Sequence, residues 1–193
     1  MITMKFETAT NRCPICNETA VVNTIPKYHY LQSGLEDVYL SNGVARIHCP
    51  THGTLIHVPN EQQVLQVLAL ELLVKPALLS PAELLFLRKS CGLTQSVMAK
   101  LLGLRGHATV AERELGKSRI TAESDFYYRA RIARLLWELH VKHSEKSFLA
   151  PVHIKRLKRI LEHFTDLVMQ PAVSEKQELN LVLDHDAWQG RAA

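Results

Sequence analysis

The stretch LSPAELLFLRKSCGLTQSVMAKLLGL, residues 79–104, contains the signals of two helices in succession. Ser80 supplies an N-cap hydroxyl, Pro81 suits the first helical position, and Glu83 is placed to complete a capping box. A helix is therefore expected to begin at this point and to end near Cys91, where a glycine follows.

Thr94 is the expected cap of the next helix, QSVMAKLL, which Gly103 closes. Met98 contributes to an apolar stripe on this helix, and the small side chain of Ala99 allows another helix to cross closely. Two helices with this spacing are typical of helix-turn-helix units, which present a further helix to the major groove of DNA.

The candidate recognition helix lies within LRGHATVAERELGKSRIT, residues 104–121, with Val110 expected to face inward. Over residues 81–142 the Lys and Arg residues number eleven and the Asp and Glu residues six, so the excess positive charge of the chain falls here. Phosphate neutralisation requires such a distribution. The residues expected to contact DNA in this segment are Arg105, His107, Thr109, Arg113, Lys117 and Arg119.

The four cysteines are too few for a dense disulfide framework, and two of them form the motif Cys13-x2-Cys16. The same spacing recurs at Cys49 and His52, again with a proline after the first residue. Two such knuckles supply four tetrahedral ligands, and three thiolates with one imidazole suit Zn²⁺. One structural zinc ion per chain is therefore predicted, with Cys91 outside the ligand set as a small buried side chain.

The fourth ligand has competitors, because His48 and His57 also flank Cys49, although only His52 matches the knuckle spacing. A thioredoxin-type redox pair would require Cys13 and Cys16 to open a helix within a larger α/β pattern, which the sequence does not show. A catalytic zinc needs an open coordination position and a nearby general base. The pattern favours a closed structural site, and no enzymatic activity is expected.

The segments around the cysteine pairs read as β-strands, over AVVNTIPKYHY (residues 20–30) and DVYLSNGVARIH (residues 37–48). Asn42-Gly43 predicts a hairpin turn inside the second segment. Strands between two zinc knuckles indicate a small N-terminal zinc ribbon. Val64 to Val74 then has the length of a connecting helix, which is expected to end near Pro76.

Beyond the candidate DNA-binding segment, DFYYRARIARLLWELHVKH (residues 125–143) predicts a helix whose apolar face is broad enough for a core and a partner. Pro151 can open a further amphipathic helix, on which apolar residues recur from Ile154 to Val168. Packing against the folded chain is favoured over a membrane surface for this helix. LNLVL, residues 179–183, is expected to pair as an edge strand.

At Thr94–Gly103 the sequence resembles the Cro and lambda-repressor (XRE) type of helix-turn-helix, Thr-Gln-x-x-Leu-Ala-x-x-Leu-Gly. Thr109-Val110 with Glu114 and Gly116 is similar to the Thr-Val-x-x-Trp-Glu-x-Gly of that family. With the N-terminal zinc finger, residues 10–140 resemble the MqsA-like antitoxins, which join a YgiT-type zinc finger to an XRE domain. The resemblance implies a dimeric, autoregulatory repressor that binds operator DNA and neutralises a small toxin protein, with Gln95 near the DNA backbone.

The expected fold class is mainly α with a small N-terminal β zinc ribbon and an XRE, lambda-repressor-like helical domain. The expected divisions are a zinc ribbon over residues 1–60, a connecting helix over 61–79, a DNA-binding domain over 80–142 and a C-terminal extension over 143–193. Without an apolar run long enough to cross a bilayer, a cytoplasmic protein is expected. The alternative function is a protein-binding adaptor, in which the ribbon and the C-terminal helix hold a partner and the helix-turn-helix unit is a scaffold.

Overall fold

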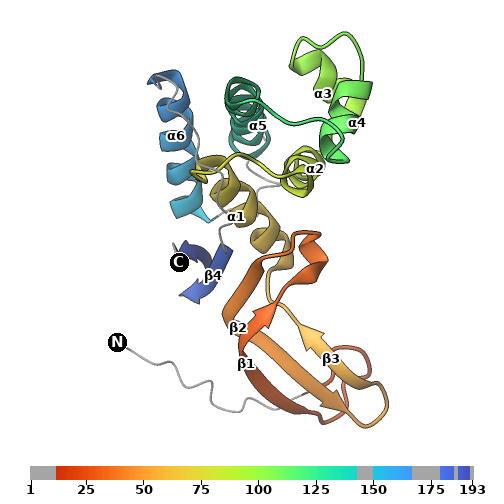
Figure 1. Cartoon of the computed structure of the whole chain (residues 1–193). Coiled ribbons are helices and arrows are strands. Elements are labelled where there is room, and N and C mark those ends of the chain that lie inside the picture. The colour runs from red at the N-terminus through yellow and green to blue at the C-terminus, as the bar shows by residue number, and fades with distance from the viewer. Residues whose placement is uncertain (1–11, 143–149, 167–178, 185–186, 192–193) are drawn as a thin grey trace.

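The computed structural model describes residues 12–142, 150–166, 179–184 and 187–191 (Figure 1). Within these ranges the chain forms six α-helices and a five-stranded sheet. The strands are β1 (Val21–His29), β2 (Val38–Cys49), β3 (Gly53–His57), β4 (Leu179–Asp184) and β5 (Ala187–Arg191). The helices are α1 (Glu61–Val74), α2 (Pro81–Ser90), α3 (Gln95–Leu101), α4 (Ala108–Glu114), α5 (Ala122–Lys142) and α6 (Pro151–Asp166), and a 3₁₀ turn covers Leu31–Ser33.

Strand β2 is the centre of the sheet, because it pairs along both of its edges. β1 lies antiparallel to it along one edge. The other edge is shared: β3 pairs antiparallel with Ala45–Cys49, while β4 pairs in parallel with Val38–Ser41. β5 then pairs antiparallel with β4 and completes the sheet. Strands from both ends of the chain therefore share one sheet.

This topology contradicts the predicted fold class. The β structure is not a small N-terminal ribbon followed by an XRE, lambda-repressor-like helical domain, because a five-stranded mixed sheet incorporates the C-terminal strands. One hydrophobic core runs from Leu40 in β2 through Leu70 in α1 to Ile132 in α5 and Trp188 in β5. The core is therefore continuous across the predicted boundaries near residues 60 and 79. The parallel pairing of β2 with β4 has no local sequence signal, since its partners lie at opposite ends of the chain.

The predicted hairpin at Asn42-Gly43 is also wrong, because β2 runs without interruption through both residues. Asn42 adopts a φ of 64°, and the register with β1 shifts between Ile25 and Lys27. Pro26 lies at this register shift, opposite Asn42 and Gly43 of β2. Proline is tolerated at such irregular positions of a sheet. The left-handed residue that suggested a turn instead makes a β-bulge.

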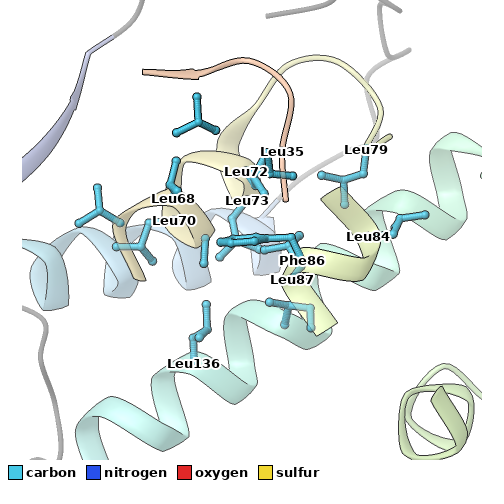
Figure 2. Close-up of a cluster of buried hydrophobic side chains, with 14 of the residues drawn as sticks. Leu35, Leu68, Leu70, Leu72, Leu73, Leu79, Leu84, Phe86, Leu87 and Leu136 are labelled. Carbon is cyan, nitrogen blue, oxygen red and sulfur yellow. The ribbon is translucent and has the colours of Figure 1, made fainter. Parts of the chain in front are cut away.

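Helix α1 is the central helix of the molecule (Figure 1) and is mostly buried. As predicted, it ends at Val74, before Pro76. Its leucines meet side chains from the sheet side and from α2 and α5; Leu35, Leu87 and Leu136 are examples in Figure 2. A helix that is apolar on nearly all faces is expected in the interior, so α1 is a core element as well as a connection.

The predicted caps are present. Ser80 and Glu83 form a capping box at α2 with Pro81 in its first turn, and the Thr94 hydroxyl accepts a hydrogen bond from the Val97 N–H at α3. Helix α5 begins near the expected position and fixes the segment between α1 and α2. Its buried Arg129 donates hydrogen bonds to carbonyl oxygens of Leu72, Lys75 and Ala77.

Pro151 begins α6, as predicted, and Leu157 and Ile160 of this helix are buried. Leu167 and Val168, the last residues of the predicted apolar stripe, lie outside the described residues. The Arg156 guanidinium pairs with Glu71 of α1, so α6 is packed on the fold. LNLVL forms β4, as expected, but it lies between β2 and β5 instead of at an edge.

Candidate functional site

Cys13, Cys16, Cys49 and His52 converge at the end of the sheet where β2 meets β3. Their candidate ligand atoms all lie within 4.8 Å of one another. The Cys16 and Cys49 Sγ atoms are 3.5 Å apart, and His52 Nδ1 lies 3.7 Å from the Sγ atoms of both Cys13 and Cys49. These four side chains could hold one metal ion.

The backbone of the first knuckle positions Cys13 and Cys16. The Asn17 N–H donates to the Cys13 carbonyl at 2.9 Å, and the Cys13 N–H donates to the Glu18 carbonyl at 2.8 Å. Asn17 adopts a φ of 62°, a left-handed conformation that asparagine tolerates better than most residues. The chain therefore turns tightly enough to direct both thiols to one point.

The second knuckle is the turn from β2 into β3. Cys49 is the last residue of β2 and pairs with Gly53, whose φ of 72° suits a residue without a Cβ. The His52 N–H donates to the Cys49 Sγ at 3.4 Å. The sheet thus holds Cys49 and His52 at a fixed separation.

The structure distinguishes among the three histidines near Cys49. His48 Nδ1 shares a hydrogen bond with the Thr54 hydroxyl at 2.9 Å, away from the thiols. His57 pairs with Ala45 at the other end of β3. His52 is the histidine that joins the cluster.

The cluster favours thiolate at two of its cysteines. Backbone N–H groups of Cys16 and Ile15 lower the pKa of the Cys13 thiol to about 6 despite its burial. Burial raises the pKa of Cys49, but hydrogen bonds from His52 and from the Thr51 backbone outweigh it and lower the pKa. Thiolates are the form of cysteine that binds metal.

The residues that surround these ligands were not predicted from the sequence. Glu18 Oε2 accepts hydrogen bonds from the Thr51 hydroxyl at 2.5 Å and from the Cys16 thiol at 3.6 Å, which links the two knuckles. Beneath the ligands, Ala20 and Ile47 are the other buried members of a small cluster, separate from the main core. Glu18 lies two residues after Cys16, but no spacing rule marks it as a partner of the second knuckle.

The second candidate region is the pair of short helices α3 and α4, which lies far from the β1–β3 strands (Figure 1). Buried Glu114 of α4 receives two hydrogen bonds from Arg88 of α2, at 2.6 and 2.8 Å. The Gln95 side chain of α3 donates to the same carboxylate at 2.9 Å. One buried acid therefore fixes α2, α3 and α4 relative to one another.

The predicted DNA contacts lie in different environments. Arg105, His107, Lys117 and Arg119 are exposed. Thr109 is half-buried, and Gln95 is half-buried with its amide bonded to Glu114. Arg113 is half-buried and its guanidinium donates to the Ser124 hydroxyl at 3.4 Å. The partners of Gln95 and Arg113 were not apparent from the helix-turn-helix pattern, which marks positions and not side-chain contacts.

Comparisons of the chain with protein-family models, curated proteins and solved structures return no match. The resemblance to the MqsA-like antitoxins therefore stays a prediction. Across the described ranges, the chain contains no helix with the length and apolarity needed to cross a bilayer.

Proposed function

We propose that the chain is a DNA-binding transcriptional repressor that carries a structural zinc ion. The observation that carries this proposal is the set of exposed cationic side chains in the loops that flank α4, formed by Arg105, Lys117 and Arg119, next to helices that a buried ion pair holds in place. Cations next to a rigidly held helix suit the regularly spaced phosphates of a duplex.

Zinc is the metal that the cluster suits best. A zinc–sulfur bond of about 2.3 Å makes the edge of a sulfur tetrahedron about 3.8 Å long. The Cys16 and Cys49 Sγ atoms are 3.5 Å apart, and the His52 Nδ1 lies 3.7 Å from the Sγ atoms of Cys13 and Cys49. These separations are close to the expected edge. Four protein ligands would occupy all four coordination positions of a tetrahedral zinc ion, and structural zinc sites have this arrangement.

The small hydrophobic cluster at this end of the sheet supports a structural role for the ion. Two of its four buried members, Cys13 and Cys49, are themselves candidate ligands. So few apolar side chains contribute little to the free energy of folding, and small modules of this kind depend on a metal or a disulfide. Zinc would thus hold the two knuckles together at the end of β2 and the beginning of β3.

The DNA-binding part of the proposal depends on how α4 is presented. Val110 is buried against the fold, while Ala108 and Glu112 on the same helix are exposed. The connection from α3 reaches α4 through exposed Arg105 and His107. The buried face of this short helix packs on the fold, and cations lie in the loops at both of its ends. The exposed face can therefore approach a groove while the cations contact phosphates.

The test is fluorescence anisotropy of the zinc-loaded full chain with a duplex from its own upstream region, over a range of salt concentrations. Affinity should fall steeply as salt rises, and Arg105→Gln and Lys117→Gln should each reduce the slope by about one phosphate contact. Lys155→Gln is the control, because it removes the same charge from an exposed position on α6. Absence of binding at low salt, or an equal loss in Lys155→Gln, would contradict the proposal.

The adaptor alternative gives a different outcome in the same preparation. An adaptor would copurify with a small protein encoded beside it and would bind no duplex at low salt. A repressor that is also an antitoxin would copurify with that small protein and would also bind the duplex. A palindromic operator would in addition require two copies of the chain, measurable by the stoichiometry of the complex.

A further inference from the structure

A cavity of about 530 Å³ lies where the segment between α1 and α2 faces the segment between α4 and α5. The first segment contributes Lys75 and residues 77–79 to the lining, and the second contributes Gly116 and residues 118–120. The volume falls within the range of small-molecule sites, which is about 300–1,000 Å³. The metal cluster and the exposed faces of α3 contribute no residue to its lining.

Much of the lining is apolar. Leu78 and Leu79 come from the α1–α2 segment, Leu84 from α2 and Ile120 from the segment before α5. Leu79 and Leu84 belong to the hydrophobic core and are held rigidly by it. This side of the cavity therefore suits an apolar group.

The charged side chains that line the cavity are cationic, and they differ in whether a carboxylate pairs with them. Lys75 is neutralised by Glu83, whose two carboxylate oxygens lie 2.8 and 2.9 Å from the ammonium. Arg113 and Arg119 also line the cavity. Among the described residues neither guanidinium forms a salt bridge with a carboxylate.

Arg113 has an additional unsatisfied group. Its Nε is buried and has no hydrogen-bond partner in the described part of the chain. The contact from Arg113 to the Ser124 hydroxyl is long, at 3.4 Å. A buried donor without an acceptor is unfavourable, and most such groups in folded proteins have a protein, water or ligand partner.

We propose that this cavity binds a small organic anion, whose phosphate or carboxylate group is held by Arg113 and Arg119 and whose apolar part lies on the leucines and Ile120. Two guanidinium groups provide planar forks of donors that match the oxygens of either head group. The proposal goes beyond DNA binding, since it concerns a ligand of the free protein. Because Arg113 belongs to α4, an occupant would contact the helix that is proposed to meet DNA.

Isothermal titration calorimetry of the zinc-loaded full chain at physiological salt tests the proposal, with phenyl phosphate and benzoate as probes and benzyl alcohol as the uncharged analogue. At least one anionic probe should bind saturably with one site per chain, and the preferred probe identifies the head group. Arg113→Gln and Arg119→Gln should each weaken that binding by about tenfold or more. Arg131→Gln is the matched control, because it removes the same charge from an exposed position on α5.

Three outcomes would overturn the proposal: no saturable binding of either anion, equally tight binding of benzyl alcohol, or an equal loss in Arg131→Gln. If Arg113→Gln loses its helical circular dichroism signal, Arg119→Gln decides the result, because Arg119 is exposed and makes little contribution to packing.

Discussion

The indole ring of Trp188 lies directly against Gly43, so that a Cβ built on the glycine would be 2.8 Å from Cη2 of the tryptophan. Trp188 is fully buried, and its ring N–H donates to the Pro59 carbonyl at 2.9 Å. Its backbone N–H donates to the Gln63 side chain at 3.1 Å. One C-terminal side chain therefore joins the bulge of β2 to the beginning of α1.

Gly43→Ala should destabilise the protein, because the new methyl group would overlap the Trp188 ring and the Leu183 Cβ at 2.9 Å. Overpacking of this kind costs about 1–3 kcal/mol in the free energy of unfolding, measurable by urea denaturation. Gly106→Ala is the control, since a Cβ there meets nothing within 4 Å. Equal stability of the two variants would show that Trp188 does not hold this position.

Cys13→Ser should remove the metal. The wild type should contain about one equivalent of zinc per chain after dialysis, and the variant much less, by inductively coupled plasma mass spectrometry. Cys91→Ala should retain the metal, because Cys91 lies outside the cluster and burial raises its thiol pKa to about 12. Equal zinc content in both variants would exclude the proposed ligand set.

Glu114→Gln should destabilise the helical part of the protein. Burial alone would raise the pKa of Glu114, but hydrogen bonds from Arg88 and Gln95 outweigh it and lower the pKa. Removing one partner of a buried pair costs about 3–5 kcal/mol. The side chains of Arg88 and Glu114 are only 9% and 3% exposed, so solvent provides little compensation.

The loss in Glu114→Gln should depend on pH. An acid with a lowered folded-state pKa contributes stability above its unfolded-state pKa, and the contribution disappears as the pH falls through the folded-state value. The difference from wild type should therefore be largest near neutral pH and shrink in acid. Glu138→Gln is the control, because the Arg134–Glu138 pair is exposed, at 66% and 35%, and should change stability by about 0.5 kcal/mol or less. A pH-independent difference would contradict this role of the charge.

Arg129→Lys should destabilise the protein although it preserves the charge. The guanidinium donates to carbonyls of Leu72, Lys75 and Ala77, and a lysine ammonium cannot reach all three with the same geometry. Leaving buried carbonyls unsatisfied should cost about 1–3 kcal/mol in thermal or urea unfolding. Arg131→Lys, at an exposed position on the same helix, should have little effect.

Local signals in the sequence predicted much of the helical structure and the metal-ligand set. The capping box of Ser80 and Glu83, the Thr94 cap and the Pro151 start depend on partners within one helical turn, so the sequence shows them directly. Cys13, Cys16 and Cys49 were likewise identified from knuckle spacing, because a tight turn determines where neighbouring thiols point.

Long-range pairing was not predictable in the same way. Asn42-Gly43 has the composition of a hairpin turn, yet these residues form a bulge beneath Trp188, because a buried contact from the other end of the chain outweighs local turn preference. Knuckle spacing favoured His52 among three nearby histidines, and the structure confirms it, because the register of β2 with β3 directs His52 to the thiols.

By itself, the sequence determined where helices begin and end and which side chains can bind metal, since these properties depend on residues close together in the chain. Tertiary structure decided that β4 pairs in parallel with β2 and that the Arg129 guanidinium donates to the Leu72 carbonyl near the end of α1. It also placed Arg113 and Arg119 together in one cavity. Each of these depends on burial and hydrogen bonding between distant segments, for which no local pattern of residues is required.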